Sequence, residues 1–238
     1  MSVMTVRGSG GSLDWPAYPH EALAVVVSVR AGTLSVLMWQ RALPPYPRRW
    51  ALPGGALAPD ERLRESLQRH LADKVALRDI AYLEQLATHS ATKRDPRGRV
   101  LATGYLGIVA SDVEPQLPPD TEWVAVDAPP ATAFDHHDFV TAGVDRLRAK
   151  LSYTNIGFAL APPTFTLSEL RDVISAALGY SVHPTNLARV MTRRELIEAT
   201  GEVSSSGPGG GRPAAIYRFR SRELLVTDPF AVLRPPRS

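Results

Sequence analysis

The sequence predicts a mixed α/β (α+β) protein in two parts: an α/β/α sandwich with a mixed sheet, then a smaller module of helices and a β-hairpin. Up to about residue 152, strand-like segments occur in mixed order with two amphipathic helices, which is typical of a sandwich. The length of 238 residues exceeds the common domain size of about 100–150 residues and agrees with two domains. We expect a flexible N-terminus over 1–18, domains over 19–152 and 153–226, and a C-terminal tail over 227–238.

The composition excludes several classes of protein. Hydrophobic residues make up 44% of the chain, which indicates a folded protein rather than a disordered one. The longest apolar run, 23–29, is far shorter than the roughly 20 residues of a membrane span, and no secretory signal opens the sequence. The absence of cysteine excludes disulfides, thiolate metal sites and thiol nucleophiles. We therefore expect a cytoplasmic protein with no membrane partner.

The net charge of +3 belongs to the second part. Residues 1–150 carry 17 basic and 17 acidic side chains, whereas residues 151–238 carry 10 arginines and 7 acidic residues. Seven of these arginines lie within 183–222, against three glutamates. A solvated surface explains such an excess, and so does a partner that carries phosphate groups.

The first part contains the segments of a sandwich. Residues 23–30 and 33–41 are β-branched and apolar on both sides of the short Ala31-Gly32 turn, which predicts a hairpin. Further strands are expected over 80–88, 99–110 and 122–126, and an amphipathic helix over 135–151.

A glycine loop and a helix follow the hairpin. The segment Trp50-Ala-Leu-Pro-Gly-Gly55 is typical of a strand that breaks into a loop. Residues 61–77 place an apolar residue at every fourth position, which predicts a helix with one buried face. These apolar residues are Leu63, Leu67, Leu71 and Val75.

This loop and helix resemble the signature of the Nudix hydrolases, Gly-x5-Glu-x7-Arg-Glu-U-x-Glu-Glu-x-Gly-U, where U is a bulky apolar residue. Gly55, Glu61 and Arg69 match in identity and spacing, and Leu71 and Leu77 match the apolar positions. The resemblance implies a Nudix-like fold for the first part. The positions that depart from the signature are His70, Asp73, Lys74 and Ala76.

The departures remove the metal chemistry that the signature implies. Nudix enzymes hydrolyse nucleoside diphosphates linked to another group, with Mg²⁺ or Mn²⁺ held mainly by helix carboxylates, because hard cations take oxygen ligands. Positions 70, 73 and 74 share one helical face, and a His, an Asp and a Lys stand there in place of three carboxylates. We expect no metal site, no required cofactor and no catalytic residue. The degenerate positions are Glu61, Arg69, His70, Asp73 and Lys74. In a purely structural interpretation, Glu61 and Arg69 simply form an ion pair that stabilises the loop.

A pocket without metals can still bind its nucleotide. Gly54 and Gly55 let a ligand approach the backbone closely, and Arg48 and Arg49 offer charge-assisted bonds to a diphosphate. Trp50 is a candidate for stacking on a base, although a strand tryptophan is more often part of the core. The polar loop over 89–99 is rich in basic side chains. The expected effector-binding residues are Arg48, Arg49, Trp50, Gly54, Gly55, Arg94, Arg97 and Arg99.

The second part has the element order of a winged helix-turn-helix. Thr166 and Glu169 fit a capping box at the start of a helix over 168–178, which Gly179 ends. Pro184 suits the start of the next helix. That helix is expected over 185–194, and a strand over 196–199, a flexible tip over 201–211 and a strand over 215–219 complete the wing.

The second of these helices separates an apolar face from a polar one. Asn186 can bond to adenine, and Arg189 or Arg193 to guanine, each bond worth about 1–3 kcal/mol of discrimination. Taken singly, each side chain is explained by solvent exposure, but helix order, polar face and basic wing together favour DNA binding. The expected DNA-binding residues are Thr185, Asn186, Arg189, Arg193, Arg194, Arg212 and Tyr217.

Over about residues 20–222 the chain is similar to the Nudix-related transcriptional regulators of bacterial NAD metabolism (NrtR type). The resemblance implies a homodimeric repressor of NAD biosynthesis or salvage genes. It also implies that the first domain binds ADP-ribose or a related NAD metabolite, and that the protein then releases double-stranded, palindromic operator DNA. The segments that carry it, in family order, are 82–86, 94–99, 134–136, 146–150, 165–170 and 211–214.

Two other functions stay open. The first is a Nudix pyrophosphatase that hydrolyses ADP-ribose or a related nucleoside diphosphate derivative, since weak hydrolysis is compatible with a degenerate helix. The second is a metabolite-sensing module whose C-terminal domain binds a protein rather than DNA.

Overall fold

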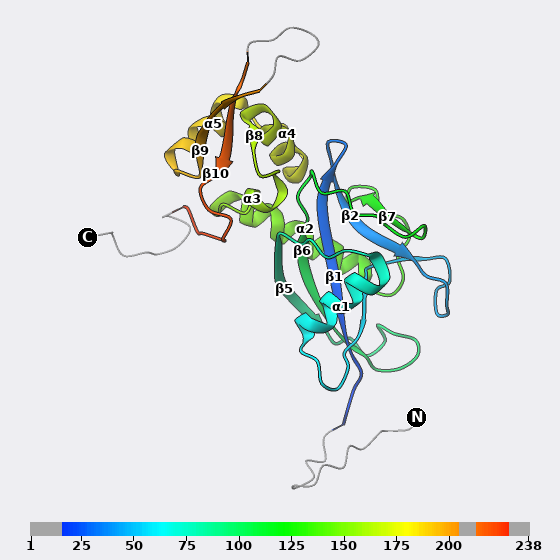
Figure 1. The fold of residues 1–238 in the computed structure, drawn as a ribbon. Coiled ribbons are helices and arrows are strands. Elements are labelled where there is room, and N and C mark those ends of the chain that lie inside the picture. The colour runs from blue at the N-terminus through cyan, green and yellow to red at the C-terminus, as the bar shows by residue number, and fades with distance from the viewer. Residues whose placement is uncertain (1–15, 205–212, 229–238) are drawn as a thin grey trace, which may run out of the picture.

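The computed structural model describes residues 16–204 and 213–228 and shows a sandwich joined to a smaller module (Figure 1). Most of the expected flexible N-terminus, the wing tip with Arg212, and most of the expected tail lie outside the described residues.

The sandwich is built on a mixed seven-stranded sheet. Its strands are β1 (His20–Arg30), β2 (Thr33–Gln40), β3 (Trp50–Ala51), β4 (Gly54–Ala56), β5 (Tyr82–His89), β6 (Leu101–Ile108) and β7 (Thr121–Ala125). β1 and β6 are parallel, whereas the other strand pairs are antiparallel. One edge of β1 pairs with β4 near the start of the strand and with β2 near its end. The predicted mixed sheet and the predicted hairpin are thus confirmed.

Alternation along β1 divides the sandwich into two cores. Successive side chains of a strand point to opposite faces. Ala24 and Val26 belong to the cluster that helix α1 (Leu63–Val75) covers, and Val25 and Val27 to the cluster that helix α2 (His136–Tyr153) covers. The two helices therefore lie on opposite faces of the sheet (Figure 1).

Helix α1 ends at a left-handed residue that is not glycine. Its predicted apolar face is buried at Leu67, Leu71 and Val75. Ala76, which closes the helix, has a φ of 52°, and a residue with a side chain pays about 1–2 kcal/mol in this region. The Nudix signature has glycine here, so the alanine strains the end of the helix.

The second part is a winged helix. Its elements are α3 (Gly157–Leu160), β8 (Phe165–Thr166), α4 (Leu167–Leu178), α5 (Pro184–Arg193), β9 (Ile197–Val203) and β10 (Ala215–Phe219), and the sheet order is β8-β10-β9. The predicted capping box is present, with the Thr166 N–H donating to Glu169 at 2.7 Å and the Glu169 N–H to Thr166 Oγ1 at 3.3 Å. Gly179 ends α4 with a φ of 80°.

One hydrophobic core joins the two parts. The cluster covered by α2 continues from Val29 and Leu34 at the tip of the β1–β2 hairpin into Leu170 and Ile174 of α4 and Met191 of α5. Helix α4 contacts β1, β2 and α2. The winged helix is therefore packed onto one end of the sandwich and is not merely tethered to it.

Three short elements were not predicted: β4, α3 and β8. Each has four residues or fewer, which is too short to show a helical or strand period in the sequence. β9 also runs through Gly201 to Val203, beyond the predicted end at residue 199. The wing strand is longer than expected because its partner β10 provides hydrogen bonds that the sequence pattern does not reveal.

Replacing Ala76 with glycine is expected to raise the free energy of unfolding by roughly 0.5–1 kcal/mol. The substitution removes the cost of about 1–2 kcal/mol that a side chain imposes in the left-handed region. The greater entropy of glycine in the unfolded chain opposes this gain by only about 0.4–1 kcal/mol. Urea unfolding measures the change. Ala72→Gly inside the same helix is the matched control and should lower the free energy by about 1 kcal/mol. A loss of stability at both positions would contradict the strain at Ala76.

Candidate functional site

Gly54 and Gly55 are required by close packing against β1 and α1. Gly54 pairs with Leu23 and has a φ of 147°, and a Cβ there would lie 2.1 Å from the Ala22 carbonyl oxygen. A Cβ on Gly55 would lie 2.7 Å from the His70 ring. The glycines therefore let the loop pass directly beneath α1, so side chains of α1 reach the loop's carbonyl oxygens.

The expected ion pair between Glu61 and Arg69 is present. Arg69 donates hydrogen bonds from Nε and Nη2 to the Glu61 carboxylate, with an Nη2–Oε2 distance of 2.8 Å. These bonds lower the pKa of Glu61 to about 2. The Ala58 N–H also donates to Glu61, at 3.2 Å. The pair therefore fastens the loop that precedes α1 to the helix itself.

The face of α1 turned to the glycine loop does not fit a divalent cation. His70 Nε2 lies 3.0 Å from the Ala56 carbonyl oxygen; because a carbonyl only accepts, this nitrogen carries the hydrogen and has no lone pair for a metal. Lys74 Nζ donates to the Gly54 carbonyl oxygen at 2.7 Å. Within the described part of the chain, no group of three or more His, Cys, Asp or Glu residues is placed to hold a metal ion.

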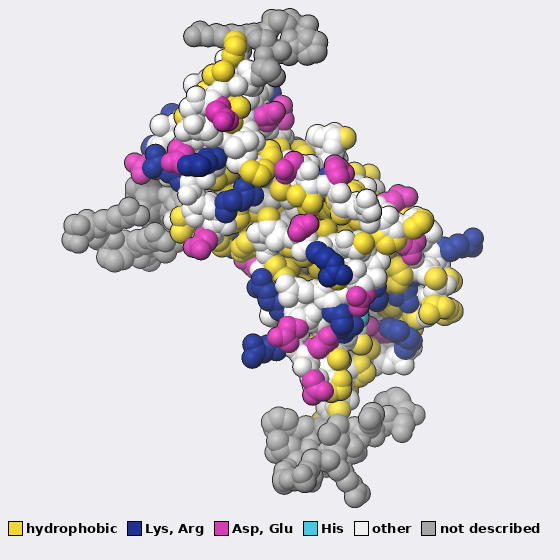
Figure 2. Space-filling model, in the orientation of Figure 1, with side chains coloured by type: hydrophobic (Ala, Val, Ile, Leu, Met, Phe, Trp, Pro, Cys, Tyr) yellow, Lys and Arg dark blue, Asp and Glu magenta, His cyan; other side chains and the backbone are white. Residues whose placement is uncertain are grey.

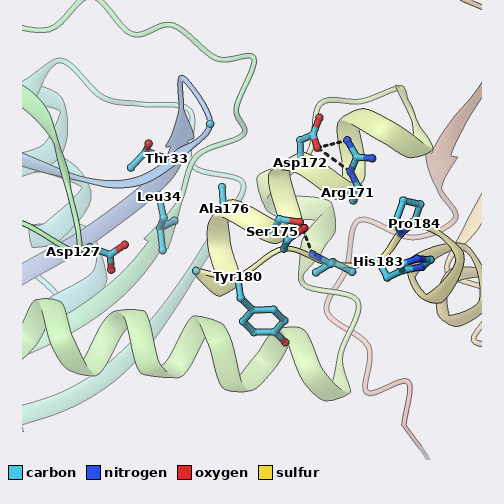
Figure 3. Close-up of a pocket in the computed structure, with 14 residues that line it drawn as sticks. Thr33, Leu34, Asp127, Arg171, Asp172, Ser175, Ala176, Tyr180, His183 and Pro184 are labelled. Carbon is cyan, nitrogen blue, oxygen red and sulfur yellow. Dashed lines mark hydrogen bonds and ion pairs between the residues drawn. The ribbon is translucent and has the colours of Figure 1, made fainter.

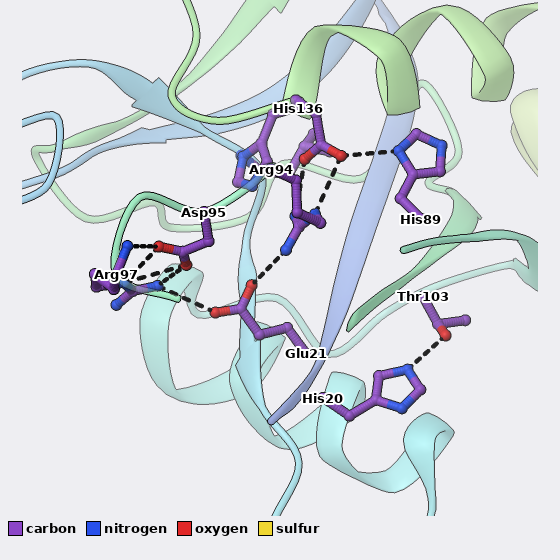
Figure 4. A network of polar contacts seen from close by, with 10 residues as sticks. His20, Glu21, His89, Arg94, Asp95, Arg97, Thr103 and His136 are labelled. Carbon is purple, nitrogen blue, oxygen red and sulfur yellow. Dashed lines mark hydrogen bonds and ion pairs between the residues drawn. The ribbon is translucent and has the colours of Figure 1, made fainter. Parts of the chain in front are cut away.

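Basic side chains converge on Glu21 beside the glycine loop (Figure 4). Arg94 Nη1 lies 3.7 Å and Arg97 Nη2 3.5 Å from the Glu21 carboxylate. Arg97 is also paired with Asp95 at 2.5 Å. The Arg94 side chain is 1% exposed, and its Nη1 has no hydrogen-bond acceptor among the described residues.

The same loop is fastened to the start of α2. Arg94 donates from Nε and Nη2 to the Asp135 carboxylate, at 3.1 and 2.8 Å. His89 Nδ1 lies 2.9 Å from that carboxylate, and its ring stacks on Phe139 with 3.8 Å between centroids. Burial raises the pKa of Asp135, but the hydrogen bonds from Arg94 and His89 outweigh it, so the pKa is lowered and the carboxylate stays charged.

His136 joins the strand before the glycine loop to α2. The ring is buried, and Nδ1 accepts a hydrogen bond from the Leu52 N–H at 2.9 Å. Burial lowers the pKa of His136 to about 3, so the ring is neutral near pH 7. Nearby, the Ala133 N–H donates to the Trp50 carbonyl oxygen at 2.8 Å. A displacement of this strand therefore reaches α2 directly.

The predicted effector residues fall into two groups. The first group, at or beside the Glu21 cluster, is Gly54, Gly55, Arg94 and Arg97. The second group is Arg48, Arg49, Trp50 and Arg99. Among the described residues, no hydrogen bond or ion pair links any of these four to Glu21. Trp50 is half-buried against the core, and the Arg99 guanidinium lies 5.0 Å from the Tyr18 ring centroid. The effector-binding role of both groups stays a prediction.

Sequence reasoning missed an aromatic and cationic cluster next to this site. The Phe134 ring has the Arg41 guanidinium 4.9 Å and the Arg97 guanidinium 5.5 Å from its centroid, and the Tyr46 ring packs edge-on at 5.1 Å. Phe134 opens the segment 134–136 used in the family resemblance. However, nothing in the sequence relates it to Arg41, which is about 90 residues away.

The polar face of α5 is exposed as predicted. Asn186, Arg189 and Arg193 lie at the surface, whereas Leu187 and Met191 are buried. Arg189 Nη2 donates to Asn186 Oδ1 at 2.9 Å. The arrangement leaves a row of polar side chains on the outer side of the helix.

Arg194 and Tyr217 lie in different surroundings. Arg194 directly follows α5 and is 13% exposed; it donates to the Ser152 carbonyl oxygen at 3.0 Å and to Asp228 at 2.8 Å. Tyr217 is half-buried in β10. Thr185 is exposed. The DNA-binding role of all of these residues, and of Arg212 outside the described residues, stays a prediction.

A cleft of about 820 Å³ separates the β1–β2 turn from the end of α4 (Figure 3). Its lining includes Thr33, Asp127, Ser175 and Tyr180. The glycine loop pairs with β1 at Leu23. The turn lies eight residues further along the strand, and eight residues of extended chain span roughly 25 Å. The cleft therefore lies between the two parts and far from the glycine loop.

Charge is distributed evenly on the face drawn in Figure 2, where Lys and Arg side chains are intermixed with Asp and Glu. On the winged helix, Arg218 is paired with Glu198 at 2.8 Å. The described residues contain no helix long and apolar enough to cross a membrane.

Comparisons with known proteins agree with this architecture. Two family models match the chain, the NUDIX domain over residues 19–142 and the NrtR DNA-binding winged helix domain over 157–219. The chain is 36% identical over 224 residues to the ADPR responsive transcriptional repressor NtrR of Acinetobacter baylyi. The matched region covers 89% of this chain and 87% of the relative.

Solved structures give the same result. Shewanella oneidensis NrtR complexed with a 27mer DNA is 30% identical with a TM-score of 0.71, over 84% of this chain and 93% of that one. The NUDIX domain of the same protein complexed with ADP ribose is 29% identical with a TM-score of 0.51, over 58% of this chain and 94% of that one. Fold and sites thus define a Nudix domain joined to a winged helix. The chain belongs to the NrtR family.

Protonation of His136 should destabilise the protein in acid. Its folded pKa of about 3 lies below the ordinary value of 6.5, so the neutral ring contributes stability that is complete above pH 6.5 and is lost as the pH falls toward 3. His136→Gln keeps an acceptor for the Leu52 N–H and removes the titration. The free energy of unfolding, measured against pH, should therefore fall less steeply in this variant. His137→Gln, at the exposed neighbouring position, should keep the wild-type slope, and equal slopes in all three proteins would contradict the assignment.

Proposed function

We propose that the protein is a metabolite-responsive transcriptional repressor of NAD biosynthesis or salvage genes, and that its Nudix domain binds ADP-ribose or a related NAD metabolite. The Acinetobacter relative, which is named as an ADPR-responsive repressor, supports this function, as do the Shewanella structures solved with DNA and with ADP ribose. The observation that carries it is the union, in one chain, of a Nudix domain in which His70 and Lys74 are hydrogen-bonded to the glycine loop and a winged helix with an exposed polar face on α5.

The DNA side of the proposal rests on α5. Asn186, Arg189 and Arg193 are the side chains that would reach base edges in the major groove, where Asn recognises adenine and Arg recognises guanine. A homodimer would place two copies of α5 on half-sites one helical turn or a multiple apart, so the operator should be palindromic.

The Nudix domain would act as a receptor and not as an enzyme. His70 and Lys74 are hydrogen-bonded to the loop carbonyls, and Glu61 is paired with Arg69. Hydrolysis assisted by a hard cation needs oxygen ligands on this face. The enzyme alternative is tested by incubating the protein with ADP-ribose and Mg²⁺ or Mn²⁺. Turnover that Glu61→Gln abolishes would favour a pyrophosphatase.

Helix α2 is the proposed route between the two sites. Its first turn is bonded to the effector side through Asp135 and His136, and the carbonyl oxygen of Ser152, in its last turn, accepts from Arg194 at the end of α5. Its 18 residues span about 27 Å. A ligand releases DNA only if it binds the DNA-incompetent arrangement more tightly. A shift of α2 would provide that difference.

The deciding experiment is a gel-shift titration of DNA upstream of the cell's own NAD genes. The protein should bind this DNA, and ADP-ribose should raise the dissociation constant by about 5–150-fold, the usual range of allosteric coupling. Arg189→Ala should lose about 1–3 kcal/mol of discrimination between operator and scrambled DNA. Arg78→Ala, an exposed charge on the sandwich, is the control. Affinity that hardly changes with salt would favour a protein partner instead.

Arg194→Gln separates the proposed coupling role from a phosphate contact. If Arg194 couples α5 to α2, the variant should bind operator within about threefold of the wild type, while the effect of ADP-ribose shrinks toward none. The neighbouring exposed Arg193 is the matched control, because Arg193→Gln should weaken DNA binding and keep the ratio of affinities with and without ADP-ribose. Weaker binding of Arg194→Gln to all DNA with an unchanged ratio would restore the phosphate contact predicted from the sequence.

A further inference from the structure

The ammonium group of Lys74 lies on the glycine loop. Nζ donates to the Gly54 carbonyl oxygen at 2.7 Å and lies 5.3 Å from the centroid of the Trp39 ring. Gly54 is held in place by its pairing with Leu23 of β1. The positive charge is therefore held at a fixed place beside the loop.

This ammonium is still available to a ligand. It has three N–H donors, and within the described residues Gly54 is its one hydrogen-bond acceptor. Lys74 as a residue is exposed. The ammonium end is partly desolvated beside the loop, which lowers the pKa of Lys74; the charge of Glu21 opposes this shift, and the charges of Arg41 and Arg69 add to it.

The carboxylates close to the loop are already neutralised. Glu21 lies between Arg94 and Arg97, Asp95 is paired with Arg97, and Glu61 with Arg69. A divalent cation would therefore compete with arginines for every one of these oxygens and would meet the Lys74 charge at the Gly54 carbonyl.

We propose that the Lys74 ammonium takes the place of the divalent cation of a Nudix site, so that this chain binds the diphosphate of its nucleotide without a metal. The inference rests on the proposed function for the identity of the ligand. The Gly54 carbonyl, a hard oxygen ligand, is bonded to a cation that belongs to the protein. The two remaining N–H donors would bond to diphosphate oxygens, and a charge-assisted bond of this kind is about twice as strong as a neutral one.

The first test is the affinity of the full-length protein for ADP-ribose, measured by calorimetry in EDTA and in MgCl₂. The wild type should bind equally well in both buffers. Lys74→Met, which keeps the length and removes the charge, should weaken binding by about tenfold in both. Arg64→Met on the same helix is the control, because Arg64 lines a separate hollow with Gln68 and Ala72. Tighter wild-type binding in Mg²⁺, or unchanged binding by Lys74→Met, would overturn the proposal.

The second test does not depend on the nucleotide. Mn²⁺ is added to ¹⁵N-labelled protein, and paramagnetic broadening of the Gly54 and Gly55 amide signals is followed by NMR. The wild type should show no selective broadening there, whereas the double variant His70→Glu/Lys74→Glu should show it. Selective broadening in the wild type would overturn the inference. If no form binds ADP-ribose, the effector assignment fails, and the Mn²⁺ result still tests whether this face of the wild-type α1 binds a divalent cation.

Thermal unfolding of each variant accompanies both tests. A Lys74→Met protein that unfolds with the wild-type midpoint but binds about ten times more weakly supports a direct role in binding. A variant that loses affinity only in proportion to a lowered midpoint would assign Lys74 to fold stability and overturn the proposal.

Discussion

Helix α2 is fastened at both ends by arginines, and the relation between the two parts of the molecule depends on this constraint. Arg94 grips Asp135 at the start of the helix, where the buried His136 also accepts from Leu52. At the other end, Arg194 donates a hydrogen bond to the Ser152 carbonyl oxygen. Between them the helix lies on the sheet with Phe139 and Leu147 fully buried. Hydrogen bonds thus connect one end of this helix to the segment beside the glycine loop and the other end to the residue that follows α5.

The strand that carries this arrangement is β1. Its alternating side chains give one core to each helix, and its length separates the glycine loop from the hairpin tip on which α4 packs. The buried core crosses from sandwich to winged helix without a break. The two domains therefore pack directly against each other, with a cleft where they meet, and are not joined by a linker alone.

The fold was largely predictable because its long elements carry strong periodic signals. The apolar face of α1, the capping box at Thr166 and the end of α4 at Gly179 could all be predicted from the sequence. Contacts between distant residues were not: the pairing of Arg94 with Asp135 joins loop and helix across 41 positions, and that of Arg194 with Asp228 joins a helix end to the described end of the chain. Sequence reasoning could identify basic residues, but not which were already neutralised. It likewise gave Gly54 a ligand-facing role, whereas close backbone packing is enough to require it.

The two ends of the winged helix meet at one place. Asn155, just after α2, donates to the Glu223 carbonyl oxygen and accepts from the Leu225 N–H, and the Thr227 N–H donates to the Tyr153 carbonyl oxygen. Hydrogen bonds thus hold the segment before the winged helix against the segment that follows it. Because the core of the module is continuous with that of the sandwich, a winged helix put in its place would also have to supply the apolar surface of α4 that packs against Val29 and Leu34.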